Sequence, residues 1–248
     1  MSRGIFIIGT DTDAGKTVIS AGLLYLLLKN KYRAAYFKPV ASGETDISGV
    51  KMSIDAAFVK RAAGFSEDQK LVTPFAFADA VAPHLAARLV HRAIDVAVIQ
   101  KSLNELMNRY DVIIGEAAGG LAVPLNDDGY MQYELIRKLG FPCLLVARAG
   151  LGTINHTLLT LNMAERVGLK IKGIIINGAG PTLIEQDNVA TIKKLSGVRA
   201  IFTLPPLVSV DTEKLQAGNL REVFERTIDI DDIVALMETL EKDGRAYV

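Results

Sequence analysis

Residues 5–17, IFIIGTDTDAGKT, decide the fold of this chain. The apolar residues 5–8 predict a short buried strand, and a helical pattern follows the stretch. A strand, a loop that ends in Gly-Lys-Thr and a helix form the layout of a phosphate-binding loop. Strict counting back from Gly15, however, puts Thr10 rather than a glycine at the first position, and Gly9 lies one residue too early. The stretch therefore predicts a lengthened phosphate-binding loop.

Each part of this loop has a chemical role toward a nucleotide. Gly15 has no side chain, so neighbouring backbone N–H groups can turn toward phosphate oxygens. Lys16 brings a cation to the terminal phosphates, and the Thr17 hydroxyl is placed to hold Mg²⁺. The positive end of the following helix points at the same anion. A glycine-containing turn without a ligand is the alternative, but the strand before the loop and the helix after it favour nucleotide binding.

The composition restricts the partners and the compartment that we expect. Of 248 residues half are apolar, and 28 Lys and Arg balance 28 Asp and Glu, so we expect no nucleic acid and no membrane surface as a partner. The apolar segments are of strand length or are broken by charges, and residues 1–4 lead straight into a strand, so we expect neither a membrane span nor a cleavable signal. The single cysteine, Cys143, excludes an internal disulfide and fits a core thiol. These features predict a cytoplasmic protein.

Apolar strand-like runs alternate with helical periodicity along the whole chain. The runs are continuous, as in a parallel sheet that helices cover on both faces. We therefore predict a single α/β domain over residues 1–248, with a doubly wound, mostly parallel sheet like that of P-loop NTPases. A long loop at 203–229 is expected to precede a final helix at 230–242. The predicted strands are residues 4–8, 34–38, 111–115, 142–148, 171–177 and 199–202, and the other predicted helices lie near 16–30, 53–63, 94–109, 130–139, 153–167 and 185–195.

Polar or glycine-rich residues follow the predicted strands, at the ends where ligands gather in such folds. Lys38 ends the second strand, and its position favours a second cation for a phosphoryl group or an oxyanion over a surface lysine. Glu116 ends the third strand, which is typical of a carboxylate that contacts Mg²⁺ directly or through water. Asn177 ends the fifth strand, and its amide suits a nucleobase edge and a simple turn equally well.

Other polar residues are less informative by themselves. Asp55 lies near a helix start and, from spacing alone, is interpreted as an ordinary carboxylate stabilised by the helix dipole. Asp11 and Asp13 lie inside the phosphate loop, where negative charge repels phosphate unless metal or lysine offsets it. We expect no catalysis by histidine, because metal-ligand spacing and a nucleophile partner are both missing around His84, His91 and His156.

Several motifs, in their order along the chain, resemble the dethiobiotin synthetase family. The resemblance extends to about Leu207, and the lengthened loop together with KPVASG is its specific part. It implies ATP-dependent closure of a urea ring on 7,8-diaminononanoate. One amine would react with CO₂ or bicarbonate to give a carbamate, which attacks the γ-phosphate of ATP. The second amine would then displace phosphate from the anhydride. The motifs are GTDTDAGKT at 9–17, FKPVASG at 37–43, Ser53–Asp55, Ala82-Pro83-His84, EAAGG at 116–120, GLGTINH at 150–156 and the strand end at Asn177.

The resemblance also implies catalytic, metal-binding and nucleotide-binding residues. Lys16 and Lys38 would balance charge on the phosphoryl group and the carbamate. Thr17, Asp55 and Glu116 would hold Mg²⁺, which replaces the interpretation of Asp55 from spacing. The residues implied to bind ATP are Asp13, Ala14, Gly15, Lys16, Thr17, Val18, Asp55, Glu116, Ala117, Ala118, Gly119, Asn177, Gly178, Pro205, Pro206 and Leu207.

For the organic substrate, the resemblance implies contacts on two subunits. Members of the family are homodimers with the substrate at the interface. Thr12 and Ser42 would contact the diamine or carbamate end. The amides from Gly150 to Asn155, at a helix start, would hold the carboxylate tail in the partner subunit's site.

Three departures from the family pattern bear on nucleotide binding. Position 117 is alanine where glycine is usual, which adds a methyl group where backbone approaches the ligand. Residues 202–206 are Phe-Thr-Leu-Pro-Pro rather than the usual Gly-Glu-Ile-Pro run, and residues 177–180, Asn-Gly-Ala-Gly, contain more glycine than expected. These departures put base contacts and nucleobase selectivity in question.

Three alternatives to a dethiobiotin synthetase were weighed. A cobyrinate-type amidating enzyme would carry a glutaminase domain with a nucleophilic cysteine, whereas Cys143 lies in a predicted strand. A partitioning ATPase would usually carry an additional lysine early in the phosphate loop, where this chain has Asp11 and Thr12. For a catalytically inactive homologue, Ala117 is the only indication.

Overall fold

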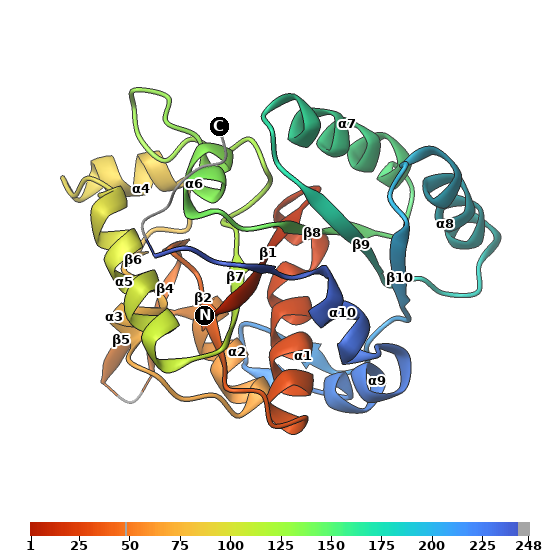
Figure 1. The fold of residues 1–248 in the computed structure, drawn as a ribbon, viewed down its shortest axis with the longest axis horizontal. Helices are drawn as coiled ribbons and strands as arrows, with labels where there is room; N and C mark the ends of the chain where they lie inside the picture. Colours follow the sequence, from red (N-terminus) through yellow and green to blue (C-terminus); the bar gives the residue numbers. More distant parts are fainter. Residues whose placement is uncertain (48, 243–248) are drawn as a thin grey trace.

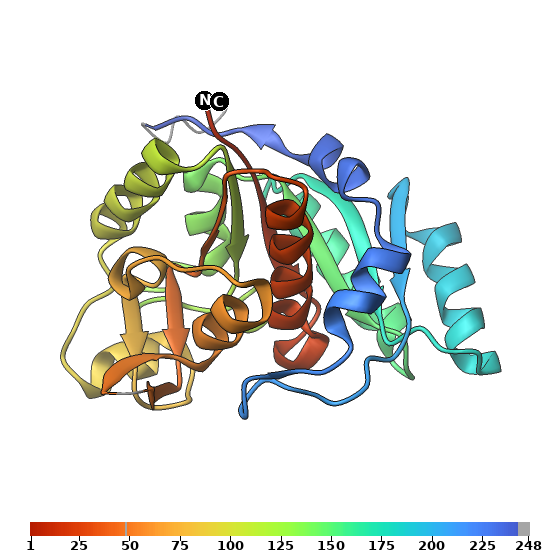
Figure 2. The ribbon, with the colours of Figure 1, turned by 90° about the horizontal axis from the view of Figure 1, so that it is seen from below.

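The computed structural model describes residues 1–47 and 49–242, and within them the central sheet has seven strands. Six are parallel, in the order β10-β9-β8-β1-β7-β2, and β13 pairs with β1 in the antiparallel sense. Figures 1 and 2 show helices on both faces of this sheet, which confirms the predicted α/β fold class. The parallel strands are β1 (Arg3–Gly9), β2 (Ala34–Phe37), β7 (Val112–Glu116), β8 (Cys143–Arg148), β9 (Ile171–Asn177) and β10 (Ala200–Leu204).

The centre of the sheet is apolar on both faces, as the continuous runs predicted. Residues 5–8 of β1 and 143–146 of β8 are buried throughout. Cys143 is one of these core residues, and burial raises the pKa of its thiol, so the predicted core thiol is confirmed. Among the described residues, no helix has the length and hydrophobicity that a bilayer span requires.

The strand order changes direction at β1, which has β7 on one side and β8 on the other. The carboxyl ends of parallel strands meet at one edge of a sheet, and ligands bind where the order reverses. The phosphate loop follows β1 directly, and Lys38, Glu116 and Asn177 lie at the ends of the other strands. The topology therefore brings the predicted site residues to one edge.

The predicted helices are present, with ends that shift by a few residues. One of them starts at Val96 rather than at residue 94, because the Asp95 side chain accepts a hydrogen bond from the Ala97 N–H, 2.7 Å away, and caps the helix. These helices are α1 (Lys16–Lys29), α2 (Ile54–Ala63), α5 (Val96–Arg109), α6 (Gln132–Leu139), α7 (Thr153–Arg166) and α8 (Leu183–Leu195).

Between β2 and α5 the chain forms small elements that sequence patterns did not predict. β3 (Val40–Ser42) pairs in parallel with β6 (Phe75–Phe77), and β4 (Glu44–Ile47) pairs with β5 (Val50–Ser53) in the antiparallel sense. The short helices here are α3 (Gln69–Val72) and α4 (Pro83–Leu89). Elements of three to seven residues are too short to leave a readable period, so the sequence could not indicate them.

The predicted long loop at 203–229 is wrong. β10 continues to Leu204, and a small hairpin of β11 (Val210–Asp211) and β12 (Gln216–Ala217) precedes the helix α9 (Leu220–Thr227). The α9 helix forms because three of its apolar side chains are buried; Phe224, the largest, packs against Gly22 of α1.

The predicted final helix at 230–242 is also wrong in its second half. The helix α10 ends at Leu236, and β13 (Glu238–Thr239) then pairs with Arg3 and Gly4 of β1. β8 begins to pair with β1 only at Phe6, so the start of β1 has a free backbone edge on that side. Pairing with β13 satisfies those backbone groups.

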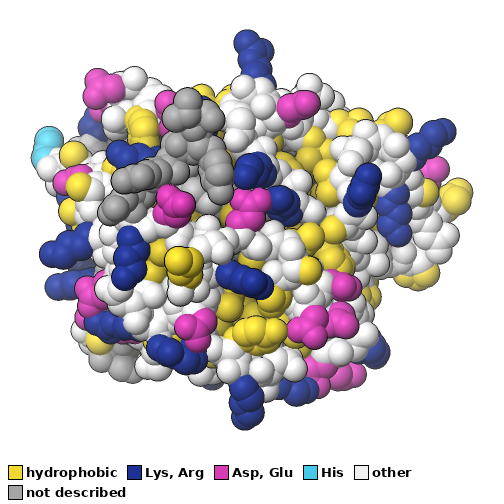
Figure 3. All heavy atoms as spheres, in the orientation of Figure 1, with side chains coloured by type: hydrophobic (Ala, Val, Ile, Leu, Met, Phe, Trp, Pro, Cys, Tyr) yellow, Lys and Arg dark blue, Asp and Glu magenta, His cyan; other side chains and the backbone are white. Residues whose placement is uncertain are grey.

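The described surface carries both signs of charge. On the face shown in Figure 3, basic and acidic side chains are interspersed, in keeping with a net charge of zero for the whole chain.

Candidate functional site

The phosphate loop needs a glycine at position 15 for two reasons. Its φ is +99°, in the left-handed region that side chains disfavour. In addition, a Cβ atom there would lie 2.2 Å from Nδ2 of Asn177. That same Nδ2 donates a hydrogen bond to the Ala14 carbonyl oxygen at 3.2 Å. The end of β9 is therefore held directly against the loop that follows β1.

Lys16 is buried at the start of α1. Its ammonium group donates hydrogen bonds to the carbonyl oxygens of Asp11 and Thr12, at 2.9 Å each. Burial, together with the nearby charge of Lys38, lowers the pKa of Lys16 to about 8. Its cation is held by weak neutral acceptors, which phosphate oxygens can replace.

Lys38 lies just after β2, with its ammonium group between two carboxylates. Its Nζ atom is 2.7 Å from Oε1 of Glu116, and it also forms an ion pair with Asp55. Burial by itself would lower the pKa of Lys38, but the two carboxylates outweigh it and raise that pKa. Burial would likewise raise the pKa of Asp55, and Lys38 reverses this shift. Lys38 and Asp55 are therefore both charged at neutral pH.

Oxygen atoms of Thr17, Asp55 and Glu116, which lie far apart in the chain, meet at this site. The Thr17 hydroxyl lies 3.0 Å from Oδ1 of Asp55 and 2.8 Å from Oε1 of Glu116. Asp55 does lie in the first turn of α2, but the interpretation of it as an ordinary helix-start carboxylate is wrong, because it faces Thr17 and Lys38.

This oxygen set fits Mg²⁺. The described residues hold no cluster of three or more His, Cys, Asp or Glu side chains that would enclose a metal by themselves. Mg²⁺ in phosphate-transfer sites needs no such cage, because one or two carboxylates, a hydroxyl, water and substrate phosphates complete its octahedron. Thr17, Asp55 and Glu116 supply that partial set.

Tyr36 is a residue at this site that sequence reasoning missed. Its hydroxyl donates to Oε2 of Glu116 at 2.9 Å, and both side chains are fully buried. Burial, followed by the charge of Glu116, raises the pKa of Tyr36 well above its usual value. The sequence AYF reads as an apolar strand, and the only available signal was that a buried tyrosine hydroxyl requires a partner.

A cavity of about 570 Å³ opens beside these groups. Lys38 and Asp55 line it, and so do the loop residues Thr12 and Asp13 and the predicted substrate contact Ser42. Two further lining residues, Thr212 and Glu213, lie on the β11–β12 hairpin and were not predicted, because the sequence pattern of 203–229 indicates only a loop. The cavity is also lined by residues 80–83, Ala118, Gly119 and Val123.

The unusual Ala117 does not narrow this cavity. Its side chain is part of the buried core and is not among the residues that line the cavity, whereas Ala118 and Gly119 are. Its N–H donates to the carbonyl oxygen of Ile7 at 3.0 Å, which extends the pairing of β7 with β1. The added methyl group is therefore accommodated in the core.

The segments expected to bind adenine lie side by side. Leu204, the last residue of β10, is the register partner of Asn177, so Gly178 and the segment Pro205–Leu207 leave the sheet together. The Ala179 N–H donates to the Leu204 carbonyl oxygen at 2.7 Å and joins them.

Two of the departures from the family pattern have structural explanations here. In the altered run at 202–206, the first three residues complete β10. Gly180 leaves room for Glu185, the capping residue of α8, because a Cβ there would lie 2.8 Å from Oε2 of Glu185.

The loop at residues 150–155 forms the start of α7, away from Ser42. It contributes to a separate cavity of about 160 Å³ that is lined by Arg148, Thr153 and His156. The Thr153 hydroxyl is buried and has no hydrogen-bond partner among the described residues. Leu151 at the tip is 93% exposed. Within one subunit, the structure therefore does not bring Gly150 and Asn155 to the cavity with Ser42.

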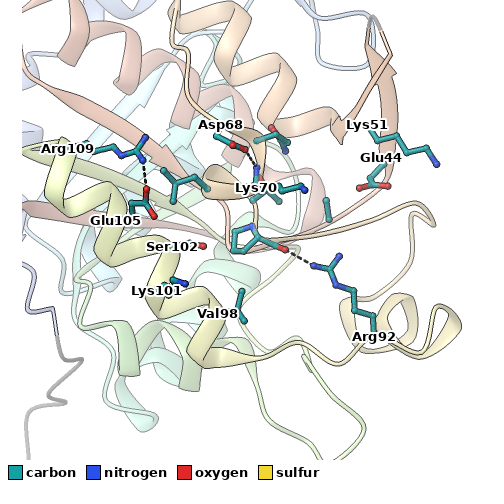
Figure 4. A pocket seen from close by; sticks show the side chains of 15 residues that line it. Glu44, Lys51, Asp68, Lys70, Arg92, Val98, Lys101, Ser102, Glu105 and Arg109 are labelled. Carbon is teal, nitrogen blue, oxygen red and sulfur yellow. Dashed lines mark hydrogen bonds and ion pairs between the residues drawn. The ribbon is translucent and has the colours of Figure 1, made fainter.

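The largest cavity that we describe, about 730 Å³, lies elsewhere (Figure 4). Charged residues of both signs surround it, including Asp68 just before α3, Lys70 on α3 and Lys101 on α5. Arg92 points into it from beyond α4 and donates to the Pro74 carbonyl oxygen at 3.0 Å. None of the predicted site residues lines it.

Comparison with known proteins places this arrangement in a family. Residues 3–214 match the family described as AAA domain. The chain is 38% identical over 243 residues to the ATP-dependent dethiobiotin synthetase BioD of Clostridium kluyveri, which covers 97% of this chain and 100% of that protein. It is 41% identical over 229 residues to BioD of Clostridium novyi, which covers 91% and 94%. The chain belongs to the dethiobiotin synthetase family.

Dethiobiotin synthetases of other bacteria match at similar levels. BioD of Bacillus subtilis is 39% identical over 213 residues, covering 85% of this chain and 90% of that protein. As a dethiobiotin synthetase, the chain is an ATP-dependent enzyme of biotin biosynthesis, a ligase that forms C–N bonds.

Among solved structures, the chain resembles P-loop ATPases in fold alone. MinD of Pyrococcus horikoshii complexed with Mg-ADP has a TM-score of 0.59 at 17% identity, covering 94% of this chain and 96% of that one. MinD of Aquifex aeolicus has a TM-score of 0.60 at 14% identity, covering 97% and 99%. This confirms the predicted P-loop NTPase type of sheet.

Proposed function

We propose that the chain converts 7,8-diaminononanoate, CO₂ and ATP to dethiobiotin, ADP and phosphate. The observation that carries this proposal is that Lys38 and Asp55, which contact Glu116 and Thr17, line one cavity together with the phosphate-loop residues Thr12 and Asp13. A nucleotide switch needs the loop and its lysine. The second buried cation, at Lys38, suits a second anionic reactant beside the triphosphate.

The first chemical step joins substrate and CO₂. An unprotonated amine of the diamine attacks the carbon of CO₂, and loss of a proton leaves a carbamate. The cavity supplies Ser42 and the loop residue Thr12 to orient the amine end. Lys38 supplies a positive charge at the wall of this cavity, so it would balance the charge that forms on the carbamate oxygens.

The second step transfers the γ-phosphoryl group. A carbamate oxygen forms the new bond to phosphorus while the bond to ADP breaks, so a carbamic–phosphoric anhydride results. Lys16 holds phosphate oxygens in place of the carbonyls of Asp11 and Thr12. Mg²⁺ bound by Thr17, Asp55 and Glu116 would neutralise charge on the β- and γ-phosphates. The chain's contribution is orientation and charge balance, which are the principal needs of phosphoryl transfer.

In the last step the second amine attacks the carbonyl carbon of the anhydride. The C–O bond to phosphate breaks, the nitrogen loses a proton and the urea ring closes. The cations that balance charge during phosphoryl transfer would also balance the charge of the departing phosphate. Asn177 and the segment Pro205–Leu207, side by side at the loop, are proposed to bind the adenine of ATP.

The carboxylate tail of the substrate is proposed to bind a second subunit. In one subunit the loop at 150–155 lies apart from Ser42, so a homodimer is needed to bring it to the diamine. The start of α7 offers backbone N–H groups and the cation of Arg148. It also offers the buried Thr153 hydroxyl, which has no hydrogen-bond partner in the described part of the chain. These groups suit a carboxylate.

A direct assay tests the proposal. The protein is incubated with ATP, Mg²⁺, bicarbonate and 7,8-diaminononanoate, and dethiobiotin and ADP are measured by mass spectrometry. We expect both products in equal amounts, with ADP release dependent on the diamine. ATP turnover at the same rate without the diamine would contradict the proposed synthesis.

A further inference from the structure

The two carboxylate oxygens of Glu116 have separate sets of partners. Oε1 accepts from the Thr17 hydroxyl at 2.8 Å and from the Lys38 ammonium at 2.7 Å. Oε2 accepts from the Tyr36 hydroxyl at 2.9 Å. Oε1 therefore faces the oxygens expected to surround Mg²⁺, and Oε2 faces into the protein.

Tyr36 and Glu116 are both held by the main parallel sheet. They lie on the neighbouring parallel strands β2 and β7, in which Tyr36 pairs with Ile114. Both side chains are 0% exposed, so water does not replace a lost partner from solvent. A carboxylate in such a place keeps the orientation that its hydrogen bonds impose.

We propose that Tyr36 is a positioning residue for the divalent cation. This proposal rests on the metal site of the proposed function. The Tyr36 hydroxyl holds Oε2 of Glu116, so that only Oε1 is presented to the cation. Without the hydroxyl, the carboxylate can rotate about its terminal bond and Oε2 is left buried without a donor. Partners that orient a metal ligand in this way typically contribute about 10–100-fold to metal affinity.

Tyr36→Phe removes only the hydroxyl and keeps the ring that fills the core. The probe is Mn²⁺, whose binding to the protein with a non-hydrolysable ATP analogue is followed by electron paramagnetic resonance. We expect Mn²⁺ to bind Tyr36→Phe about 10–100-fold more weakly than the wild type. Tyr25→Phe is the matched control, because Tyr25 also donates to a glutamate, Glu225, but on the surface. It should bind Mn²⁺ like the wild type.

A second measurement separates positioning from a general loss of structure. In EDTA, the analogue should bind Tyr36→Phe and the wild type within about twofold, since Lys16 and the loop are unchanged. Equal weakening with and without metal would show a merely structural role and overturn the proposal. Wild-type affinity for Mn²⁺ in Tyr36→Phe would overturn it as well. If the wild type itself bound no Mn²⁺ with the analogue, the metal site of the proposed function would fall first.

Discussion

Two lysines at the same site have opposite electrostatic environments. Lys16 is surrounded by backbone carbonyl groups and faces the charge of Lys38, so burial lowers its pKa to about 8. Lys38 lies against Asp55 and Glu116, which raise its pKa although it is buried too. The free protein therefore keeps the Lys38 cation well into the alkaline range, whereas Lys16 begins to lose its proton near pH 8.

This difference predicts a pH dependence of ATP binding. Bound phosphate raises the pKa of Lys16 above 8, so the complex binds more protons than the free protein. ATP affinity should consequently be constant below pH 8 and fall by up to about tenfold per pH unit above it. Calorimetric titration between pH 6.5 and 9.5 measures this, and proton uptake should appear in buffers of different ionisation enthalpy. An affinity that does not change from pH 7 to 9.5 would contradict the assigned role of Lys16.

The same lowered pKa has a consequence for stability. Between pH 8 and 10.5 the unfolded chain keeps the Lys16 proton that the folded chain has lost, so the contribution of Lys16 to stability rises with pH in that window. Lys16→Met should remove this contribution. Urea unfolding of the two proteins at pH 7.5 and 9.5 measures this. The gain in free energy of unfolding that Lys16→Met produces should be larger at pH 7.5 than at pH 9.5.

At Lys38, removal of the charge should affect both chemistry and folding. Lys38→Met leaves Asp55 and Glu116 facing each other without their cation, and breaking a buried pair in this way costs about 3–5 kcal/mol. Dethiobiotin formation should fall by more than about 100-fold. Urea unfolding with and without Mg²⁺ and ATP checks the cause, since a divalent cation should restore part of the lost stability. Lys29→Met, which removes an exposed pair with Glu225, is the control.

At the scale of elements, the docking of α9 on α1 depends on one small residue. A Cβ at Gly22 of α1 would lie 2.3 Å from the Phe224 ring of α9. Glycine inside a helix costs about 1 kcal/mol relative to alanine, so local propensity alone favours alanine at position 22. Packing and propensity therefore oppose each other here.

We expect packing to prevail in Gly22→Ala. The overpacked methyl group should lower the free energy of unfolding by about 1–3 kcal/mol, more than the helix gains. The double variant Gly22→Ala/Phe224→Leu should lose less free energy of unfolding than the sum of the losses in the two single variants, because leucine leaves space for the methyl group. Urea unfolding of all four proteins measures this coupling, and strict additivity would exclude the contact as the cause.

At the scale of the whole molecule, apolar side chains are exposed along one end of the sheet. Leu159 of α7 is 62% exposed, and Leu183 at the start of α8 is 82% exposed. Figure 1 shows α7 and α8 beside β9 and β10, at the opposite end from α5. The loop proposed to reach the partner's substrate belongs to the same end, through α7. We therefore propose this end as the contact surface of the proposed homodimer.

Leu159→Glu should weaken the dimer, because it puts a charge into an apolar contact. Light scattering after size exclusion should show a shift toward monomer, and the KM for the diamine should rise while ATP affinity stays unchanged. Val98→Glu is a matched control, since Val98 is 42% exposed on the distant helix α5. A dimer that persists in Leu159→Glu at low protein concentration would exclude this interface.

Sequence patterns were sufficient wherever neighbours in the chain determine the structure. The strands at 4–8 and 171–177 are indicated by the apolar runs at 5–8 and 174–176. The helix at 185–195 is indicated by its helical periodicity. The hairpin at 210–217 and the β13 pairing were missed, because two-residue strands exist only through their partners. The early end of α10 was missed for the same reason, since pairing with β1 competes with the helix there.

What the sequence determined by itself was the local chemistry of the phosphate loop. Its glycine, lysine and threonine are adjacent, and its extra residue could be counted. Only the tertiary structure decided how that loop is completed. Asp55 and Glu116 lie far along the chain from Thr17, and Tyr36 reads as a core residue, so no spacing joins them. The parallel sheet brings Glu116 beside the phosphate loop because the carboxyl ends of its strands meet at one edge, and the start of α2 adds Asp55 there.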